Sequence, residues 1–337
     1  MPPKPQKQAL VTIVVVNWNG RQMLSDCLEA LYKQTFRKFE ITVVDNGSKD
    51  DSVAYMSSTY PEVNLIELKH NLGFASANNL AIQNSHAAYV ALINNDACAQ
   101  LGWLGKLVKA LEKNPEAGMA ASKMVYADNP EIIDRAGDAY SVAGAGILRG
   151  RGKDKTYFSQ PEWIFGACAG AALYRMDMLK TIGLFDEDFF LLYEDVDLSF
   201  RAQLAGYKCI FVPDAVVYHK ASQTIRRDSD TSIYFGHRNL EWTYIHNMPK
   251  RLIAKTLISH CLYILFAFFF FALKGQSKIY LKAKKDALLG LNRAIKRRRY
   301  IQRNRKVDSR YIQELLSPEN FISRYTRRFA TKKQTES

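Results

Sequence analysis

Apolar runs near the start of the chain each end in polar side chains. The runs cover residues 11–16, 39–44 and 88–93, and they end in Asn17, Asp45 and Asn94-Asn95-Asp96. Mostly apolar runs of this length are typical of strands that helices bury on both faces. Apolar residues at helical spacing lie between the runs. The pattern therefore predicts β-α-β units and an α/β fold with a doubly wound, mostly parallel sheet.

The rest of the chain continues this alternation less regularly. We expect further strands at 63–68, 208–212 and 215–218, and further helices at 73–85, 103–113 and 195–205. The stretch from 137 to 152 is rich in glycine, which predicts a mobile loop.

Asp96 follows a predicted buried strand at the point where open α/β sheets bind ligands. In such sheets helices cover both faces, and the crevice opens at the carboxyl ends of the strands. Asp96 is therefore placed to bind a metal ion or a phosphate. The alternative is that Asn94-Asn95-Asp96 only forms a turn, because Asn and Asp side chains bond readily to their own backbone.

A second acidic stretch lies at 183–198, where six acids stand among aromatic residues. Glu194 and Asp195 are near the start of a predicted helix, and His219 closes a predicted strand. One carboxylate and the imidazole could hold a divalent cation that neutralises a diphosphate leaving group, while another carboxylate takes a proton from an acceptor hydroxyl. Alternatively, the two acids only favour a helix N-terminus, by about 0.3–1 kcal/mol each, and His219 is structural.

The excess of basic residues is concentrated at the C-terminal end. From Lys274 onward there are 19 Lys and Arg against 5 Asp and Glu, whereas residues 1–273 hold 28 of each class. Such a tail could bind nucleic acid or an anionic membrane surface. The preceding segment, Thr256 to Leu273, has 18 residues without a formal charge and includes four consecutive phenylalanines. This apolar segment favours a membrane surface over nucleic acid as the partner of the basic tail.

An apolar segment of this length is at the lower limit for crossing a bilayer. Because His260 interrupts its first half, we expect a helix lying in the membrane interface, with a single span or a buried soluble helix as the alternatives. Basic residues after such a helix add about 1 kcal/mol each at an anionic surface. We therefore predict no nucleic-acid partner. We expect a first domain at 1–250 and a membrane-associating apolar helix with a basic helical tail at 251–337.

The cysteines and the N-terminus bear on the compartment. The five cysteines are scattered and include no Cys-x-x-Cys pair, which supports neither a disulfide framework nor a zinc site. Met1 to Leu10 lacks the apolar run of a signal peptide. These features predict a protein on the cytoplasmic face of the plasma membrane, peripheral or with a single span.

Six stretches between residues 11 and 245 carry a further signal through their order and spacing. They are Val14 to Gly20, Val43 to Ser48, Asn71 to Phe74, Asn78-Asn79, Asn94 to Asp96 and Phe185 to Arg201. The most specific is the run Phe-Asp-Glu-x-Phe-Phe that leads to Glu-Asp-Val-Asp-Leu. In these stretches the chain resembles the family-two inverting glycosyltransferases of GT-A fold, most closely the rhamnosyltransferase-like branch that builds bacterial surface polysaccharides.

The resemblance implies a role for each matching residue. Asp45 would accept a hydrogen bond from the uracil or thymine ring of a nucleotide sugar. The other implied nucleotide contacts are Asn17, Asn71, Gly73, Asn78 and Asn95. The implied ligands of a Mg²⁺ or Mn²⁺ ion are Asn94, Asp96 and His219. Asp195 matches the catalytic base and Glu194 its orienting neighbour. The residues that fall where the acceptor binds are Trp163, Phe165, Gly166 and Gly170.

Asn94 departs from the family pattern, because it stands where the metal motif usually begins with an acid. An amide oxygen still coordinates the cation, but more weakly, so Asp96 and His219 are expected to do most of the metal binding. Arg226 and Arg227 follow His219 and could fold over the diphosphate as a lid. A solvated loop is the alternative for these two arginines.

Together with these features, the resemblance implies a metal-assisted, inverting glycosyltransferase of cell-surface polysaccharide synthesis. The expected donor is a nucleotide diphosphate sugar, with dTDP-rhamnose as the first choice, and the expected acceptor is a polyprenyl-linked saccharide. In-line attack requires the base and the acceptor to face the anomeric carbon opposite the diphosphate. A non-catalytic protein that binds sugar nucleotides is the alternative, suggested by Asn94.

Overall fold

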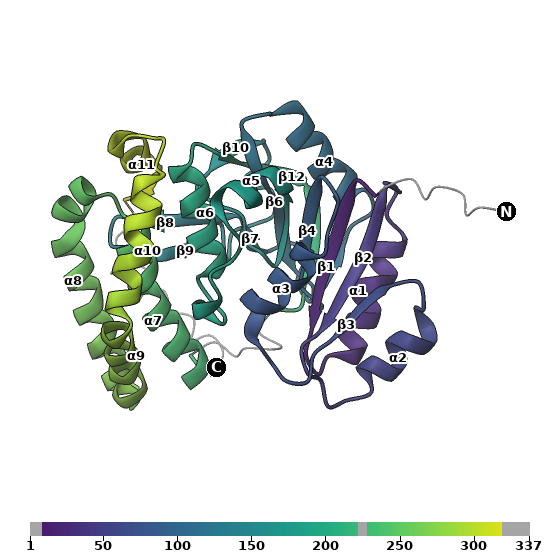
Figure 1. Cartoon of the computed structure of the whole chain (residues 1–337), viewed down its shortest axis with the longest axis horizontal. Coiled ribbons are helices and arrows are strands. Elements are labelled where there is room, and N and C mark those ends of the chain that lie inside the picture. Colours follow the sequence, from purple (N-terminus) through teal and green to yellow (C-terminus); the bar gives the residue numbers. More distant parts are fainter. Residues whose placement is uncertain (1–8, 222–227, 319–337) are drawn as a thin grey trace.

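The computed structural model describes residues 9–221 and 228–318, and a mixed β-sheet lies at its centre (Figure 1). The strands of this sheet are β1 (Val11–Asn17), β2 (Phe39–Asp45), β3 (Asn64–Glu67), β4 (Tyr89–Ile93), β5 (Ala97–Ala99), β6 (Ala117–Tyr126), β7 (Ile133–Ala136), β10 (Glu162–Ile164), β11 (Ala171–Arg175) and β12 (Lys208–His219). Their order is β10-β12-β6-β11-β4-β1-β2-β3, with β5 beside β12 and β7 beside β6. β1 runs parallel to β2 and β4, whereas β11 is antiparallel to both of its neighbours. The predicted α/β fold with a mostly parallel sheet is confirmed.

Helices cover both faces of this sheet. They are α1 (Arg21–Tyr32), α2 (Ser52–Thr59), α3 (Gly73–Gln83), α4 (Trp103–Lys113), α5 (Met176–Ile182) and α6 (Glu194–Leu204), with a short 3-10 helix at Glu187–Phe189. Ile13 and Val15 of β1 belong to the apolar cluster of α1 and α4, whereas Val14 belongs to the cluster of α3. Side chains alternate between the faces of a strand, so β1 must be apolar on both sides. This explains why residues 13–16 are all apolar and do not alternate with polar residues.

The polar clusters that end the strands meet at one edge of the sheet. In the parallel register of β1 and β2, Asn17 lies opposite Asp45. β4 is parallel to β1, so the segment from Asn94 to Asp96 leaves the sheet at the same edge. The amide of Asn94 donates to the carbonyl of Gly170 at 3.0 Å, which ties this edge to the loop that precedes β11.

The glycine-rich stretch 137–152 differs from the predicted mobile loop. It contains β8 (Asp138–Ser141) and β9 (Gly146–Leu148), which pair antiparallel and form a second small sheet with β13 (Leu316–Ser317). Gly137 and Gly144 have φ values of 76° and 80°, which only glycine adopts without cost. The glycines therefore make the turns at the two ends of β8.

The strands predicted at 208–212 and 215–218 are one strand, β12. Its register against β6 shifts between Val212 and Val216. Pro213 lies inside this interval and has no N–H to donate to the neighbouring strand. The proline thus produces an irregularity within the strand but does not end it.

The C-terminal part of the described chain is helical, as predicted. Its helices are α7 (Asp230–Asn247), α8 (Lys250–Leu273), α9 (Ser277–Leu289), α10 (Leu291–Arg303) and α11 (Ser309–Leu315). Figure 1 shows them together at the end of the molecule farthest from β3. Leu252, Ile301 and Ile312 of these helices share an apolar cluster with Phe200 of α6. The predicted boundary at residue 250 falls between α7 and α8, where the apolar packing is continuous.

α8 is the one helix in the described residues that is long and apolar enough to cross a membrane, a criterion of length and composition alone. One stripe of α8 packs against the protein, and its buried residues are Leu252, Thr256, His260, Tyr263, Ala267, Phe270 and Phe271. The opposite stripe exposes large apolar side chains, such as Ile258 at 76% and Leu273 at 81% exposure. α8 is thus largely apolar on all sides but is buried on only one.

Candidate active site

A cavity of about 1510 Å³ opens at the carboxyl ends of the strands. It extends from Trp18 and Asn46, past Asp96 and Asp195, to Leu240 on α7. Pockets for a single small ligand typically measure about 300–1,000 Å³. The cavity is therefore larger than a single small ligand requires.

A buried network of amides fixes the strand ends beneath this cavity. Asn95 Nδ2 donates to Asn17 Oδ1 at 2.8 Å, and Asn17 Nδ2 donates to Asp45 Oδ2 at 3.1 Å. The amide of Ser48 donates to the other oxygen of Asp45 at 2.8 Å. Among these residues Asn95 lines the cavity, whereas Asn17 and Asp45 are buried behind it. In this structure Asn17 and Asp45 hold the strand ends in place.

Asn46 connects the cavity wall to the start of α3. Its Nδ2 donates to Asn71 Oδ1 at 3.0 Å and to the Gly73 carbonyl at 3.2 Å, and the amide of Leu72 donates to its Oδ1 at 2.8 Å. Gly73 has a φ of +85°, and a Cβ there would lie 2.6 Å from the carbonyl oxygen of Phe190. Glycine is therefore required where α3 approaches the loop that precedes α6. Both predicted residues, Asn71 and Gly73, line the cavity.

Asp96 and His219 come together at the middle of the cavity. His219 lies at the end of β12 opposite Ala97 of β5, and its Nε2 is 3.2 Å from Asp96 Oδ1. That oxygen is buried and makes no well-directed hydrogen bond within the described residues. Two ligands that hold Mg²⁺ at about 2.1 Å and at a right angle lie roughly 3 Å apart. The pair therefore fits a divalent cation, and Asn94 lines the cavity next to it.

Asp134 on β7 orients the imidazole of His219. Its Oδ2 lies 2.8 Å from His219 Nδ1, and its Oδ1 accepts a hydrogen bond from Arg151. A proton held on Nδ1 by a carboxylate leaves the Nε2 lone pair for a metal, an arrangement that metal-binding histidines commonly share. Asp134 thus serves as the carboxylate behind a candidate ligand.

The electrostatics of this group also favour a cation between the carboxylates. Burial lowers the pKa of His219, but the neighbouring carboxylates of Asp134 and Asp96 outweigh this effect and raise the pKa to about 9. Burial raises the pKa of Asp134, but the hydrogen bond with His219 and the charge of Arg151 hold it well below its usual range. With no metal bound, the imidazolium supplies positive charge here. A divalent cation would replace the proton on Nε2.

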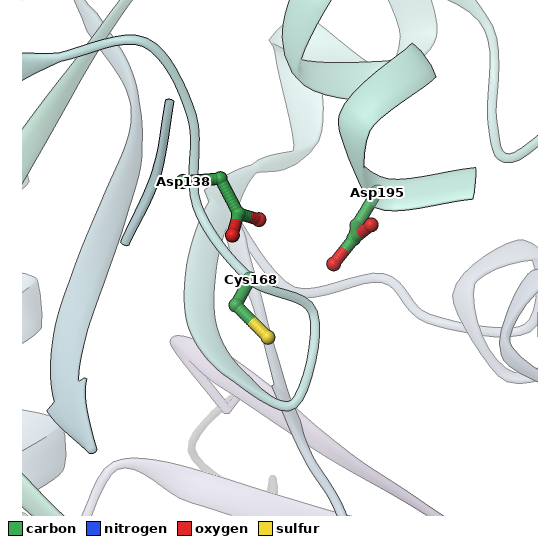
Figure 2. Close-up of side chains that lie close together, drawn as sticks. All are labelled: Asp138, Cys168 and Asp195. Atoms are coloured by element: carbon green, nitrogen blue, oxygen red, sulfur yellow. The ribbon is translucent and has the colours of Figure 1, made fainter. Parts of the chain in front are cut away.

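Asp138, Cys168 and Asp195 point toward one another from three different segments (Figure 2). Their ligand atoms all lie within 4.8 Å of one another, a spacing that could hold a metal. However, Nη1 of Arg135 donates to Cys168 Sγ at 2.6 Å and lies 3.5 Å from Asp138 Oδ1 and 3.8 Å from Asp195 Oδ2. A second cation would be repelled by the guanidinium. We therefore assign this cluster to Arg135 and not to a metal.

Asp195 is held by backbone donors at the first turn of α6. Its Oδ1 accepts from the amide of Val196 at 2.8 Å, and its Oδ2 accepts from the amide of Ala169 at 3.2 Å. The neighbouring Glu194 is different, because burial and the charge of Asp195 raise its pKa well above the usual range. The fold thus favours a neutral Glu194. Asp195 is the better placed of the two to accept a proton.

The backbone just before α6 is strained and is held by α7. Phe190, Leu192 and Tyr193 have positive φ values of 64°, 64° and 73°, which are costly for residues other than glycine. Asn239 compensates by donating from Nδ2 to three carbonyls of this loop at 2.7 to 2.9 Å. The loop can therefore turn sharply and place Asp195 at the cavity.

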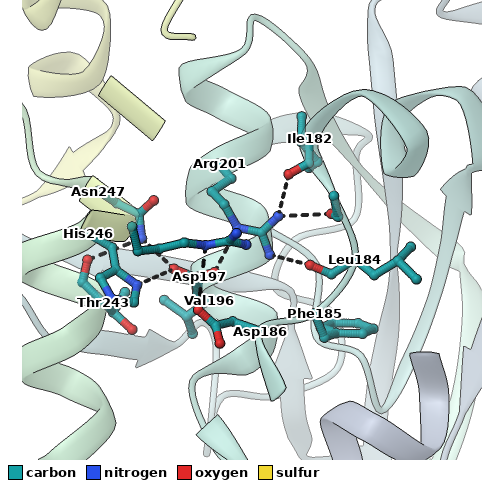
Figure 3. A network of polar contacts seen from close by, with 12 residues as sticks. Ile182, Leu184, Phe185, Asp186, Val196, Asp197, Arg201, Thr243, His246 and Asn247 are labelled. Atoms are coloured by element: carbon teal, nitrogen blue, oxygen red, sulfur yellow. Dashed lines mark hydrogen bonds and ion pairs between the residues drawn. The ribbon is translucent and has the colours of Figure 1, made fainter. Parts of the chain in front are cut away.

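A buried ion pair fixes the other side of the same turn (Figure 3). Arg201 Nε donates to Asp197 Oδ2 at 2.8 Å, and its remaining nitrogens donate to the carbonyls of residues 182–184 at 2.8 to 2.9 Å. Asn247 Nδ2 donates to Asp197 Oδ1 at 2.7 Å, and His246 Nδ1 lies 3.4 Å from the same oxygen. The network connects α6, α7 and the end of α5.

Other predicted site residues do not reach the cavity. Asn78 is buried in α3 and donates to the Phe74 carbonyl at 2.8 Å. Phe165 is 3% exposed and stacks on Tyr140 in an apolar cluster. Trp163 lies on the edge strand β10, where it packs under Lys208.

The two predicted acceptor glycines are separated in the structure. A Cβ at Gly166 would lie 2.5 Å from Ser199 of α6, so this glycine permits close packing of the helix. Gly170 lines the cavity next to Asn94. Of the four residues predicted to contact an acceptor, Gly170 is thus the one at the cavity. Arg226 and Arg227 lie outside the described residues.

The sequence prediction missed Asp134, Arg135, Asp138 and Cys168. The first three belong to one short stretch, Ile132-Ile133-Asp134-Arg135-Ala136-Gly137-Asp138. A β-branched pair followed by an acid repeats, on a smaller scale, the pattern that identified Asp96. Its strands are too short to show a clear period, so the sequence pattern does not single the stretch out.

Comparison with known proteins gives a family match for the N-terminal half. The family model described as glycosyl transferase family 2 matches residues 12–183. The chain is 28% identical to the N-acetylglucosaminyl-diphospho-decaprenol L-rhamnosyltransferase of Mycobacterium tuberculosis over 269 residues, which cover 70% of this chain and 83% of that protein. It is also 28% identical to the uncharacterized protein y4gI of Sinorhizobium fredii, over 66% of this chain and 25% of that protein. This second relative is therefore much longer than the part that matches.

Solved structures share the fold. The mannosyltransferase PcManGT of Pyrobaculum calidifontis, solved with GDP-Man and Mn²⁺, superposes with a TM-score of 0.54 at 18% identity. The superposition covers 90% of this chain and 87% of that chain. At this identity the likeness concerns the fold alone, and it extends over nearly all of both chains.

We predict that Asp138→Asn stabilises the protein at pH 8 but has little effect near pH 4. Burial raises the pKa of Asp138 to about 7, against the lowering effect of Arg135. When folding raises the pKa of a carboxyl, the free energy of unfolding falls as the pH rises from the unfolded to the folded pKa of that group. Thermal unfolding should show a gain on the order of 2–4 °C at pH 8.

Asp128→Asn is the matched control for this prediction, because Asp128 is exposed. It should leave the unfolding temperature unchanged at both pH values. An equal effect of Asp138→Asn at pH 4 and pH 8 would contradict the burial argument.

Proposed function

The chain belongs to glycosyl transferase family 2, and on this basis we propose that it is an inverting enzyme that moves a sugar from a nucleotide diphosphate to a lipid-linked saccharide. One observation carries the proposal: Asp195 and the Asp96–His219 pair line one cavity and reach it from different parts of the fold. A transfer reaction needs a proton acceptor at one position and charge neutralisation at the other. The two groups meet these two needs.

The leaving-group side is the pair Asp96 and His219. These residues would hold a divalent cation, Mg²⁺ or Mn²⁺, with Asn94 as a weaker third ligand. Such a cation supplies neutralisation of the charge that develops on the departing diphosphate. Asp134 keeps the imidazole in the tautomer that presents Nε2. The mannosyltransferase of similar fold was solved with Mn²⁺, which supports this assignment.

Asp195 acts as the general base. An acceptor hydroxyl gives its proton to the carboxylate while its oxygen bonds to the anomeric carbon, and the bond from that carbon to the diphosphate breaks. The amides of Val196 and Ala169 orient the carboxylate, and Arg135 compensates its charge from 3.8 Å. An ordinary carboxylate suffices, because the hydroxyl becomes more acidic as the new bond forms.

The nucleotide of the donor binds at the end of the cavity beneath β1 and β2. Asn46, Asn71 and Asn95 offer amide groups there, and Trp18 is 43% exposed at the same end. Rhamnose from a dTDP donor is our first choice of sugar, since the mycobacterial relative is named as an L-rhamnosyltransferase. That name also includes a decaprenol-linked acceptor, which supports a polyprenyl-linked saccharide.

In this proposal α8 lies along the membrane surface and brings the enzyme close to its lipid acceptor. On the outer face of α8 the large exposed residues are Leu257, Ile258, Leu262, Leu265, Phe266, Phe269 and Leu273. The inner face is tied down by His260, whose ring nitrogens lie 2.8 Å from the Ala143 carbonyl and 3.0 Å from Glu241 Oε2. A helix crossing the bilayer would break these contacts. We therefore favour a peripheral arrangement at the cytoplasmic face.

The activity is tested by release of nucleotide diphosphate from a panel of UDP-, dTDP- and GDP-sugars with Mn²⁺ and polyprenyl-linked saccharides. We expect one donor to be turned over and Asp195→Asn to lower kcat by about 10²- to 10⁴-fold, with donor affinity unchanged. Asp188→Asn is the control, because Asp188 pairs with Arg293 and does not line the cavity.

Two results would contradict this account in different ways. Tight donor binding without release from any donor would favour a non-catalytic binding protein. Release that is unaffected by Asp195→Asn would leave the activity in place but reject the assigned base.

Metal binding provides a test that needs no turnover. We expect Asp134→Asn to weaken the binding of Mn²⁺ by about 10- to 100-fold, measured by isothermal titration calorimetry, because a neutral amide orients the imidazole less firmly and makes Nε2 less basic than a carboxylate does. Asp138→Asn is the matched control, since Asp138 makes no contact with His219 among the described interactions. Unchanged Mn²⁺ affinity in the Asp134 variant would remove His219 from the metal site.

Membrane contact can be tested on the outer face of α8. Ile258→Glu combined with Phe269→Glu should reduce co-sedimentation with anionic liposomes by about ten-fold or more, because each change removes apolar area and adds a charge of the wrong sign. Leu101→Glu is the control, since Leu101 is 61% exposed in the turn before α4. Equal liposome binding by the α8 variant and the control would show that α8 does not contact the membrane.

A further inference from the structure

The cavity does not end at the carboxylates but continues into a space between the loop before α6, β9, α7 and α8. Its walls there are mostly apolar, although Ser232 and His237 of α7 also line it, and we call this part the apolar chamber. The residues that define it are Ile147, Leu192, Ile233, Leu240, Tyr263 and Phe271. The last four are each at most 3% exposed. A deep apolar space continuous with a polar reaction site suits a ligand that has a polar end and a hydrocarbon end.

Gly236 leaves space for the chamber, although a glycine makes α7 less stable. The residue lies in the middle of the helix on the face of Ile233 and Leu240, and it lines the cavity. A glycine inside a helix is less favourable than alanine by about 1 kcal/mol. A Cβ at this position would meet only Leu192 Cδ1, at 4.0 Å, so packing does not require the glycine. Its effect is to widen the chamber.

The chamber also lies between the proposed base and the proposed membrane surface. Tyr193 directly precedes Glu194 and packs against the cluster that contains Ile233 and Tyr263. Tyr263 and Phe271 form part of the buried stripe of α8, whose other side exposes Ile258 and its apolar neighbours. The chamber therefore adjoins the inner side of the helix whose outer side is proposed to contact the membrane.

We propose that the apolar chamber binds the hydrocarbon segment nearest the head group of the lipid acceptor. The inference rests on the proposed function, because it supplies the tail subsite for the acceptor whose hydroxyl faces Asp195. The ligand class is a long-chain isoprenoid. Binding there buries apolar surface on both sides and places the head group toward the carboxylates, so the chamber would select lipid-linked over water-soluble acceptors.

The test uses the full-length protein and farnesyl diphosphate that carries a benzophenone on its terminal unit. Irradiation followed by peptide mapping should place the cross-links on α7 and the buried stripe of α8, around Leu240, Tyr263 and Phe271. Gly236→Leu fills the chamber from one wall and should reduce labelling by about ten-fold, as expected for a loss of one order of magnitude in affinity.

Gly105→Leu is the matched control. Gly105 also lies inside a helix, α4, where a Cβ would meet Phe36 at an ordinary 3.5 Å, and it does not line the cavity. This variant should label like the wild type. If Gly236→Leu does not fold, the proposal is tested by the cross-link map of the wild type alone, which should place the labelled residues inside the chamber and not on the outer face of α8.

Labelling confined to the outer face of α8 would overturn the proposal, because the isoprenoid would then be held by the membrane surface alone. Labelling inside the chamber that is equal in Gly236→Leu and the wild type would overturn it as well. The result is separable from the proposed activity, since cross-linking needs neither donor nor turnover. A failure of nucleotide release with intact chamber labelling would reject the reaction and not the subsite.

Discussion

The buried ion pair of Asp197 and Arg201 determines where the proposed base lies. Both residues are at most 3% exposed, and removing one partner of a buried pair costs about 3–5 kcal/mol. Arg201 also binds the carbonyls of residues 182–184, so the chain that enters the loop is fixed to the helix that leaves it. Asp195 lies two residues before Asp197 on the first turn. Its place at the cavity therefore depends on this pair.

Positive charge is supplied in different ways on the two sides of the proposed displacement. Near Asp195 it is built into the chain as Arg135, which lies among three potential metal ligands and excludes a metal. Near Asp96 the buried Oδ1 and the facing Nε2 of His219 leave a place that a cation can take. The chain thus fixes the charge beside the base and leaves the charge beside the leaving group exchangeable. This division suits a reaction in which the nucleotide product must depart.

The parts of the site that could be predicted from sequence have local causes. Asp96 could be placed because a buried apolar run ends just before it, and the resemblance then paired it with His219. Asp134 and Arg135 could not be placed, since their contacts depend on how a four-residue strand, β7, pairs with β6 and on the turn at Gly137. The position of the aromatic residue Phe165 could not be predicted for a different reason. Phe165 looks the same in sequence whether it lines a cavity or fills a core, and packing decides.

The central claim is a single in-line displacement with Asp195 as the base and the metal pair behind the leaving group. The most direct measurement is the anomeric configuration of the product, determined by NMR after one round of transfer from a donor of known configuration. The account predicts inversion, because one attack from the side opposite the diphosphate reverses the centre. A product that retains the donor configuration would contradict it, since retention requires a different course at the anomeric carbon.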